Sequence, residues 1–557
     1  MLKKSTKITS MIVAISSVMS LSPSVSAFAA TKLETIDGEI DKVVAFDSGK
    51  YLYEGYKGED EDTALYFSKG EKADKYLEFD DEDLDDASIV ERFGKDSVII
   101  EDGSDLYRVN LTTGKVSDDD LPEDVEDDIE SKIRKLTNKV DRYEDYSLDS
   151  LEKVSKDQFT DENWYMYKLT KDGEDPIFGF INEKGDYVDA SYTANIQIFN
   201  GDSVKKVKEY SKSDTTKTET VVLKSIKPIA EDKNYIYTIT TVEVNGAKDL
   251  DGNGLGVVST VEGTTTTQKS DGTQYYVQKI SKSTGDTEDD AKLPKNVYSY
   301  LATETISDKD AKRGFTDLFS TTGSAVELNE CIGLRAIDDS LYFTTLNDDD
   351  DEVSVEKYDL KNLRVTPKDS SSKVSINTIV FDDSEEQEIK KDAGSVSIDK
   401  NGNVWAINKG KIYKSIKGGE FKQIYSVDGS LDQLEVYDDD NLIAYEYDGE
   451  SFATTKGKSS STDDDKKEEV VVNTYKVGWN QVAATGAWQY SKDGKTLITN
   501  QWVLDNGTWY FIGTDGIMKT GWLNDRGTWY YLNANGSMAH DTTINGYKLG
   551  SNGAWIR

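Results

Sequence analysis

Residues 502–518 read WVLDNGTWYFIGTDGIM, and twenty residues later residues 522–538 repeat the pattern as WLNDRGTWYYLNANGSM. In each copy an aromatic segment beginning at Gly-Thr-Trp-Tyr is followed by a turn that contains glycine. An aromatic segment next to such a turn is typical of a short β-hairpin. A fixed period of about 20 residues indicates stacked units. The sequence therefore predicts an array of hairpins in this part of the chain.

Looser copies flank this pair of repeats. Gly478-Trp479 with Gly486-Ala487-Trp488 come before it, and Asn545-Gly546-Tyr547 with Gly553-Ala554-Trp555 come after it. One hairpin alone is marginally stable in water, so we expect the hairpins to stabilise one another by stacking through their aromatic side chains. Four repeats are therefore predicted within residues 475–557.

A change in composition precedes the array. Residues 454–474 are polar and highly charged, which is typical of an acidic flexible linker that cannot bury a core. Seven of the nine Trp follow this linker, together with seven basic and five acidic residues from Tyr475 onward. Because the whole chain has a formal net charge of −39, the acidity belongs to the region before the repeats.

The large region 30–453 alternates short tyrosine-rich segments with turns. Val355-Glu356-Lys357-Tyr358-Asp359-Leu360 is one such segment, and residues 396–414 hold three in succession. This alternation predicts an all-β fold. Many consecutive units of about four strands suggest radial repetition, so we expect a large β-propeller-like domain of roughly six to eight blades. A chain of two or three β-sandwiches is the alternative.

One helix is expected inside this domain, near residues 122–141. Acidic residues gather at its start and basic residues toward its end, which suits the helix dipole. We expect the helix to pack on a sheet through one apolar face, and a helix that binds a partner is the alternative. That face consists of Val125, Ile129, Ile133, Leu136 and Val140.

Composition excludes several classes of function. With 105 Asp and Glu against 66 Lys and Arg, the chain would repel nucleic acid and anionic membranes. Cys331 and His540 are the single Cys and the single His, so neither an internal disulfide nor a Cys-and-His zinc site can form. Asp249 opens a segment similar to a calcium loop, but Thr260 replaces the expected Glu, which favours an acidic turn. No metal and no cofactor are expected.

Residues 1–29 predict a secretory signal peptide. They hold early lysines, an apolar run at residues 11–21 and small residues up to Ala29. The apolar run is too short to span a bilayer, which takes about 20 residues, so no membrane span is expected after cleavage. A transmembrane or covalently sorted C-terminal anchor is not expected either, because no apolar segment follows Trp555.

The run Gly527-Thr528-Trp529-Tyr530-Tyr531-Leu532, with Gly521-Trp522 before it and Gly536-Ser537-Met538 after it, resembles the choline-binding or cell-wall-binding repeats of Gram-positive surface proteins and autolysins. The resemblance covers only about residues 475–557. It implies a β-hairpin solenoid that binds ligand between successive hairpins, in a cage of two aromatic side chains from one repeat and one from the next. The partner it implies is teichoic acid choline or wall glycan.

Position by position, the resemblance implies three cages. They are Trp502, Trp509 and Tyr530; Trp522, Trp529 and Tyr547; and Trp479, Trp488 and Tyr510. The second cage departs from the pattern because Tyr547 lacks the Trp-Tyr-Tyr run, and the third because its two Trp are nine residues apart rather than seven. A quaternary ammonium has no N–H donor, so aromatic faces hold it by cation–π attraction of about 0.5–2 kcal/mol per ring.

Two alternatives to ammonium binding follow from the residue types. Flat rings also stack on sugar faces, so wall glycan is a second ligand. Aromatic and apolar side chains can also form only the hairpin cores, which is the role expected for Phe511, Met518, Tyr531, Leu532 and Met538.

These features predict a secreted protein of the cell wall or cell surface of a Gram-positive-type bacterium. The repeats would hold it noncovalently, and the propeller-like domain would be displayed to an unknown ligand. No enzyme activity is expected, because His540 lies in the repeats and the large region therefore has no Ser-His-Asp arrangement. The alternative is a wall-modifying glycoside hydrolase that uses two Asp or Glu carboxylates of the N-terminal domain.

Overall fold

The computed structural model divides the chain into two compact units, which we call the large unit (Ala30–Ser460) and the repeat unit (Ser461–Arg557). The described residues are 31–57, 63–69, 74–80, 82–84, 87–154, 159–160, 162–201, 203–213, 219–248, 250–251, 267–268, 272–302, 331–347, 351–365, 371–390, 393–455, 476–481, 488–492, 498, 501–505, 507–513, 517–525, 528–533, 535–544 and 546–556. The predicted signal peptide, most of the predicted linker, and Asp249 and residues 252–260 of the candidate calcium loop lie outside them. Helices in the described part of the chain are too short or too polar to cross a membrane.

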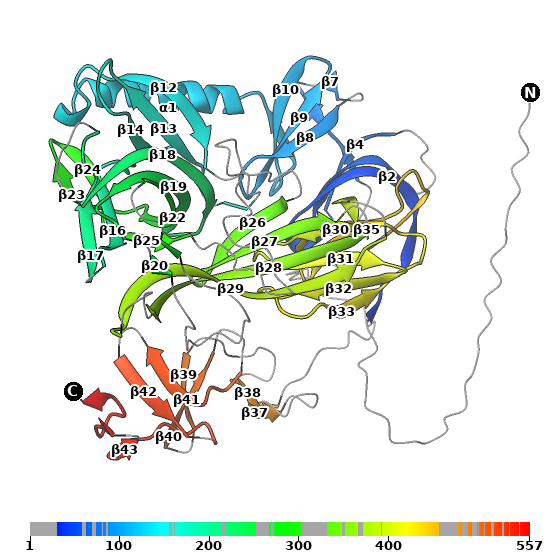
Figure 1. The fold of residues 1–557 in the computed structure, drawn as a ribbon. Helices are drawn as coiled ribbons and strands as arrows, with labels where there is room; N and C mark the ends of the chain where they lie inside the picture. Colours follow the sequence, from blue (N-terminus) through cyan, green and yellow to red (C-terminus); the bar gives the residue numbers. More distant parts are fainter. Residues whose placement is uncertain are drawn as a thin grey trace, which may run out of the picture. The chain divides into compact units, whose positions relative to one another are not determined.

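Two sheets of the large unit have four strands each, and within each sheet the strands follow one another along the chain (Figure 1). Their orders are β11-β10-β9-β8 and β12-β13-β14-β15, with antiparallel neighbours. The bounds are β8 Ser88–Arg92, β9 Ser97–Asp102, β10 Asp105–Asn110, β11 Lys115–Ser117, β12 Ser147–Lys153, β13 Trp164–Thr170, β14 Ile177–Asn182 and β15 Tyr187–Asp189. Sequential antiparallel pairing of this kind is what the alternation of strands and turns predicts.

Strands from the two ends of the large unit share one sheet. This seven-stranded sheet has the order β34-β35-β36-β2-β3-β4-β5, and Ile36 of β2 lies opposite Phe452 of β36. The bounds are β2 Thr35–Ala45, β3 Tyr51–Lys57, β4 Ala64–Ser68, β5 Lys75–Tyr76, β34 Gln433–Asp438, β35 Asn441–Tyr445 and β36 Ser451–Thr454. The pairing of β2 with β36 therefore ties the beginning of the unit to its end.

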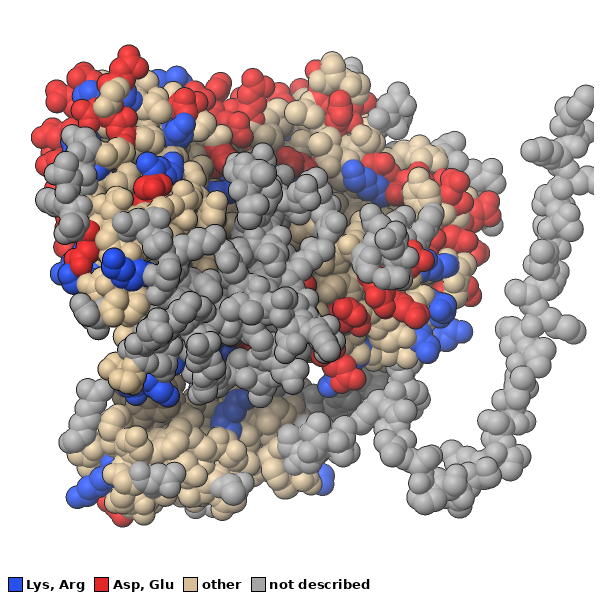
Figure 2. All heavy atoms as spheres, in the orientation of Figure 1, with Lys and Arg blue, Asp and Glu red and all other residues tan. Residues whose placement is uncertain are grey.

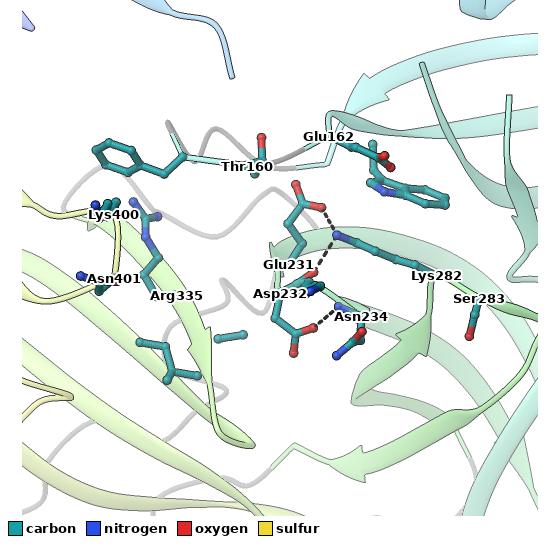
Figure 3. Close-up of a pocket in the computed structure, with 16 residues that line it drawn as sticks. Thr160, Glu162, Glu231, Asp232, Asn234, Lys282, Ser283, Arg335, Lys400 and Asn401 are labelled. Carbon is teal, nitrogen blue, oxygen red and sulfur yellow. Dashed lines mark hydrogen bonds and ion pairs between the residues drawn. The ribbon is translucent and has the colours of Figure 1, made fainter. Parts of the chain in front are cut away.

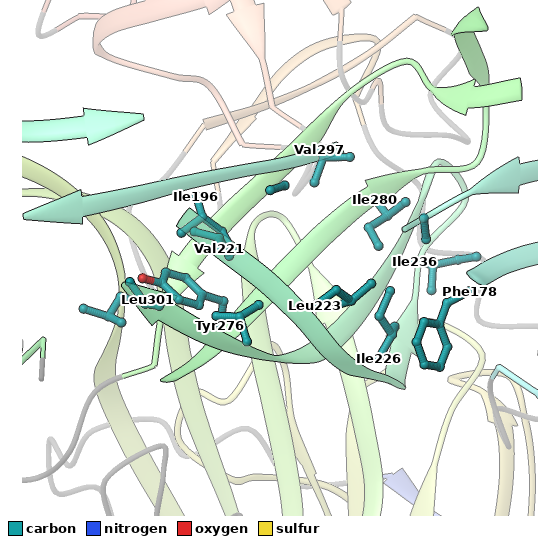
Figure 4. Close-up of a cluster of buried hydrophobic side chains, with 14 of the residues drawn as sticks. Phe178, Ile196, Val221, Leu223, Ile226, Ile236, Tyr276, Ile280, Val297 and Leu301 are labelled. Carbon is teal, nitrogen blue, oxygen red and sulfur yellow. The ribbon is translucent and has the colours of Figure 1, made fainter. Parts of the chain in front are cut away.

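The longest sheet has eight strands in the order β18-β19-β22-β25-β29-β28-β27-β26. The bounds are β18 Thr220–Glu231, β19 Tyr235–Asn245, β22 Gly272–Ser281, β25 Val297–Leu301, β26 Cys331–Ile337, β27 Ser340–Asn347, β28 Glu352–Val365 and β29 Val374–Glu388. Its two halves meet through one parallel pair, Leu301 with Thr378. One face of the sheet buries a large apolar cluster that includes Val221, Ile236 and Tyr276 (Figure 4).

The remaining strands form one five-stranded sheet and four two-stranded sheets. The five-stranded order is β1-β33-β32-β31-β30, and the short sheets pair β6 with β7, β16 with β17, β20 with β21 and β23 with β24. The bounds are β1 Thr31–Lys32, β6 Glu78–Phe79, β7 Glu82–Asp83, β16 Thr193–Phe199, β17 Val204–Glu209, β20 Leu250–Asp251, β21 Thr267–Gln268, β23 Thr284–Glu288, β24 Ala291–Pro294, β30 Val396–Ile398, β31 Val404–Asn408, β32 Lys411–Ser415 and β33 Lys422–Ser426.

The prediction of an all-β chain is confirmed, whereas the structure does not confirm the propeller. Consecutive four-stranded sets do occur, as a propeller requires. However, hydrogen bonding continues across some of these sets and joins them into sheets of eight and seven strands. The propeller, with its number of blades, stays a prediction.

Helix α1 (Pro122–Thr137) lies within the range in which the sequence predicts a helix. At its start the backbone N–H of Leu121 donates a 3.2 Å hydrogen bond to Oδ2 of Asp124, which satisfies one donor left open at the helix end. Ile129 and Ile133 are fully buried and pack in a cluster with Tyr165 of β13. The apolar face of α1 thus rests on the β12–β15 sheet. Short 3-10 helices span Asp47–Gly49, Asp141–Tyr143 and Ala393–Ser395.

The repeat unit consists of consecutive hairpins, as predicted. Three hairpins have two strands each and the fourth unit has three. The bounds are β37 Gly478–Gln481, β38 Trp488–Ser491, β39 Gln501–Asp505, β40 Thr508–Ile512, β41 Gly521–Asp525, β42 Thr528–Leu532, β43 Thr543–Ile544, β44 Tyr547–Leu549 and β45 Trp555–Ile556. Backbone hydrogen bonds link the first two hairpins to later segments, since the N–H groups of Met518 and Met538 donate to the carbonyls of Trp488 and Trp509 at 2.7 and 2.8 Å.

The acidic residues are concentrated in the large unit, as the sequence indicates. On the face that Figure 2 shows, Asp and Glu crowd the surface of the large unit, whereas most visible side chains of the repeat unit carry no charge.

Candidate functional site

Each of the three two-stranded hairpins of the repeat unit presents a pair of Trp on one face. In the β39–β40 hairpin, Trp502 lies opposite Phe511, and Leu504 lies opposite Trp509. Side chains on a strand alternate between faces, so Trp502 and Trp509 share a face and Tyr510 points to the other. A hairpin can thus contribute two Trp to a cluster on one side and one Tyr to a cluster on the other.

The first predicted cage is assembled from two repeats. The ring centroids of Trp502 and Trp509 are 6.4 Å apart with an interplanar angle of 88°. Tyr530, from the next hairpin, lies 5.0 Å from Trp502 at 69°. Phe511 packs behind Trp502, with a centroid distance of 5.2 Å. The three predicted residues therefore form one cluster of nearly perpendicular rings.

The second predicted cage repeats this arrangement with one additional ring. Trp522 lies 6.5 Å from Trp529 and 5.4 Å from Tyr547, at 78° and 79°. Trp555 stands 5.2 Å from Tyr547, and these four rings line a cavity of about 420 Å³. The departure at Tyr547 therefore does not break the cluster.

The third predicted cage forms in spite of its unusual spacing. Trp479 lies 6.5 Å from Trp488 at 88° and 4.8 Å from Tyr510 at 71°. Trp479 lies opposite Tyr490, and Gln481 opposite Trp488, which is the same register as in the β39–β40 hairpin. The two extra residues fall within 482–487, outside the described residues, and leave the pairing of the two strands unchanged.

Each cluster has at least one ring open to solvent, and the second cluster has two. The residues that the structure leaves exposed are Trp488 (40%), Trp509 (42%), Trp529 (39%) and Tyr547 (46%). By contrast, Phe511 and Leu532 are buried, which is the core role expected for them. Exposed rings that add little to the hairpin core are available for a ligand.

Two carboxylates that the sequence interpretation missed support the clusters. The indole Nε1 of Trp479 donates a 3.1 Å hydrogen bond to Oδ2 of Asp505, and that of Trp502 donates a 2.9 Å bond to Oδ2 of Asp525. The sequence feature that could have identified them is the recurrence of Asp at the same position in two repeats. Trp555 was also left out of the predicted cages, although Gly553-Ala554-Trp555 has the Gly-x-Trp spacing of Gly527-Thr528-Trp529.

The arrangement is suited to a small cation without N–H donors. When the planes of neighbouring rings are nearly perpendicular, ring faces and ring edges surround the space that a ligand would fill. Ring faces attract cations. The carboxylates next to the indoles add negative charge at the same place. No acid, base or nucleophile is needed for such binding.

Known proteins are similar to this chain in the region of the repeats. Residues 500–518 and 520–538 each match the family model described as putative cell wall binding repeat. No curated protein matches the chain. The solved choline binding domain of Spr1274 from Streptococcus pneumoniae is 37% identical, with 15% of this chain and 96% of that domain covered and a TM-score of 0.14.

Two longer solved proteins are more distant. A pneumococcal cell wall endolysin from phage Cp-1, complexed with choline, is 23% identical, with 20% of this chain and 31% of the endolysin covered and a TM-score of 0.13. CbpJ from Streptococcus pneumoniae TIGR4 is 14% identical, with 70% of this chain and 100% of CbpJ covered and a TM-score of 0.14. Through residues 500–538, the chain belongs to the family of putative cell wall binding repeats.

Proposed function

We propose that this is a secreted protein that its repeats hold noncovalently on the wall of a Gram-positive-type bacterium. The aromatic clusters bind choline of teichoic acid, with wall glycan as the alternative ligand, and the large unit displays a ligand-binding domain. The observation that carries the proposal is the recurrence of one Trp-Trp-Tyr cluster at three successive junctions between hairpins.

The ring geometry favours choline over glycan. A sugar that stacks needs one open aromatic platform, whereas rings at 69–88° to one another surround a compact group. Among the similar proteins, the endolysin is complexed with choline and the Spr1274 domain is a choline binding domain. These relatives support choline as the ligand of the clusters.

Repetition explains how weak single sites could retain a large protein. Each cluster alone would bind one choline with modest affinity, because cation–π contacts at exposed sites are worth about 0.5–1 kcal/mol each. Three clusters on one solenoid would act on the same polymer, and linked sites raise the overall affinity without new contacts. Free choline at high concentration should therefore release the protein.

The test is a titration of the full chain with choline, followed by tryptophan fluorescence. We expect a saturable change in fluorescence with choline and a much smaller change with ethanolamine. The N–H groups of ethanolamine stay hydrogen-bonded to water, which opposes its transfer into an aromatic cage. Trp509→Ala and Trp529→Ala should each reduce the change, whereas Tyr298→Ala, which removes an exposed ring of the large unit, should not. Equal responses to choline and ethanolamine would contradict the proposal.

The large unit is proposed to bind its ligand without cleaving it. A cavity in this unit is lined by Glu162 and Glu231, among other residues. The hydrogen bond and charge of Lys184 lower the pKa of Glu162, and Glu231 forms an ion pair with Lys282. A glycosidase acid must hold a proton near neutral pH, which the lowered pKa of Glu162 opposes. A clearing zone on wall-embedded gels, abolished by Glu162→Gln or Glu231→Gln, would establish the hydrolase instead.

A further inference from the structure

A cavity of about 610 Å³ lies in the large unit where segments far apart in the chain meet (Figure 3). Its lining comes from the start of β13, the turn between β18 and β19, the end of β22, the strand β26 and the turn before β31. The volume falls within the range of about 300–1,000 Å³ that is usual for small-molecule sites. Five segments converging on one volume make this cavity the strongest unassigned feature of the unit.

One side of the cavity is built around Asp232. Its Oδ1 accepts hydrogen bonds from the backbone N–H groups of Asn234 (2.7 Å) and Tyr235 (2.8 Å), and its Oδ2 accepts one from the Tyr237 hydroxyl (2.8 Å). Lys282 Nζ lies 2.6 Å from Oε2 of Glu231 and donates a 2.7 Å bond to the carbonyl of Asp232. These contacts fix the position of both carboxylates before any ligand arrives.

The opposite side carries Arg335, Lys400 and Asn401, which lie across the cavity from Asp232 and Asn234 in Figure 3. Lys400 Nζ donates a 2.7 Å hydrogen bond to Oδ2 of Asp438. The backbone N–H of Asn401 donates a 2.8 Å bond to Oδ1 of Asp399, which holds the turn. This side is also fixed by contacts within the protein.

An aromatic ring borders the same cavity. The ring of Phe159 lies 4.8 Å from the guanidinium carbon of Arg92 and 5.7 Å from the ring of Tyr437. Both neighbours contact the ring of Phe159. An aromatic face beside polar groups is a common way to bind the apolar face of a sugar ring.

The pairing of charges indicates which ligand the cavity suits. Glu231 is paired with Lys282 and Lys400 with Asp438, so a charged ligand would compete with partners already in place. The side-chain amides of Asn234 and Asn401 form no hydrogen bond to the part of the chain that the structure describes, and both residues are exposed. Each amide offers donors and an acceptor, as does a sugar hydroxyl.

We propose that this cavity binds a short neutral oligosaccharide. Hydroxyl groups of the sugar accept from the Asn234 and Asn401 amides and donate to the remaining lone pairs of Asp232. Phe159 packs on one ring of the sugar. The proposal deepens the proposed function by naming the ligand of the displayed unit, and it does not depend on how the repeats bind the wall.

The test uses the full chain on an array of short neutral and acidic oligosaccharides, with excess choline present to occupy the repeats. We expect binding to a subset of neutral sugars, with affinity at least about tenfold lower in an Asn234→Ala/Asn401→Ala variant, as two lost hydrogen bonds predict. The control Asn138→Ala changes an exposed Asn at the end of α1 and should bind as the parent does. Equal melting temperatures would show that the double variant is folded.

Three results would overturn the proposal. They are binding to no neutral sugar, binding restricted to acidic sugars, and neutral binding that survives the double Asn variant but fails in Trp509→Ala/Trp529→Ala. The last result would place sugar binding in the repeats. Failure of the full chain to bind walls would instead contradict the proposed function and leave the sugar site of the large unit intact.

Discussion

The indole Nε1 of Trp502 donates a 2.9 Å hydrogen bond to Oδ2 of Asp525, a residue of the following hairpin. Trp479 makes the equivalent bond to Asp505 at 3.1 Å. Each bond fixes the ring at the base of a cluster and also joins two repeats. The aromatic clusters and the stacking of the solenoid therefore depend on the same side chains.

Asp525 can be tested with two substitutions that separate its charge from its hydrogen bond. Asp525→Asn keeps an acceptor for Trp502 but loses the charge, so we expect choline binding about threefold weaker, as for a charge several ångströms away near solvent. Asp525→Ala also leaves the indole N–H without its partner and should cost about 1.5–3 kcal/mol of repeat-unit stability. Choline titration and urea unfolding measure the two effects. Asp541→Asn, which changes a carboxylate paired with His540, is the control.

A side chain at Gly536 should destabilise the repeat unit for two separable reasons. Its φ is +82°, which disfavours any L-residue, and an added Cβ would meet the Sδ of Met518 at 2.2 Å. Gly546 has a φ of +89° with open space around the added atom, so Gly546→Ala reports backbone strain alone, about 1–2 kcal/mol. We expect Gly536→Ala to cost about 1–3 kcal/mol more, because packing is also disturbed. Equal unfolding free energies of the two variants would contradict this reading.

Arg92 and Glu435 form a pair inside the large unit. Arg92 Nη2 donates a 2.7 Å bond to the carbonyl of Ala45 and lies 3.4 Å from Oε1 of Glu435. Among the described residues, its Nε and Nη1 have no hydrogen-bond partner. Burial lowers the pKa of Arg92 and raises that of Glu435. Glu435→Ala should therefore cost about 3–5 kcal/mol by leaving a buried charge unpaired.

A double substitution distinguishes loss of the Arg92 partner from loss of packing. Arg92→Leu/Glu435→Leu removes both charges, and we expect it to recover most of the stability lost in Glu435→Ala. Lys184→Ala, which breaks an exposed pair with Glu162, should leave the unfolding free energy almost unchanged. Denaturant unfolding measures the unfolding free energy of all three variants. If the double variant is as unstable as Glu435→Ala, the unpaired charge of Arg92 is not the cause of the lost stability.

Asp359 should make the large unit sensitive to acid. Burial acts to raise the pKa of Asp359, but hydrogen bonds from Lys361 and Ser340 and the charge of Lys357 together lower it below the ordinary 3.8. The unfolded chain then binds this proton at a higher pH than the folded chain does. The stability that Asp359 contributes is present above pH 3.8. It is lost as the pH falls through the lower pKa that Asp359 has in the folded protein. Asp359→Asn should therefore lose less stability between pH 7 and pH 3 in urea unfolding.

The repeat unit could be predicted well because its contacts are local. A hairpin places Trp502 and Trp509 on one face through its own register, and the next copy follows after twenty residues. The register also explains why the nine-residue spacing of Trp479 and Trp488 still forms a cluster. Asp505 and Asp525 were missed because an Asp at the end of a strand usually indicates only a turn.

The large unit could be predicted only as far as its class. Alternation along the chain indicates strands, but it does not specify which distant strands pair. Leu301 with Thr378 and Ile36 with Phe452 join sheets across long stretches of sequence. The cavity was missed for the same reason, because Asn234 and Asn401 each lie in an ordinary turn and come to line one cavity only through the fold.

The most direct test of wall attachment is cosedimentation of the full chain with purified cell walls, with and without excess choline. We expect the chain to sediment with the walls, to be released by choline, and to remain in the supernatant when Trp509→Ala and Trp529→Ala are combined. Sedimentation of the double Trp variant to the same extent as the parent, unaffected by choline, would show that the aromatic clusters do not hold the protein on the wall.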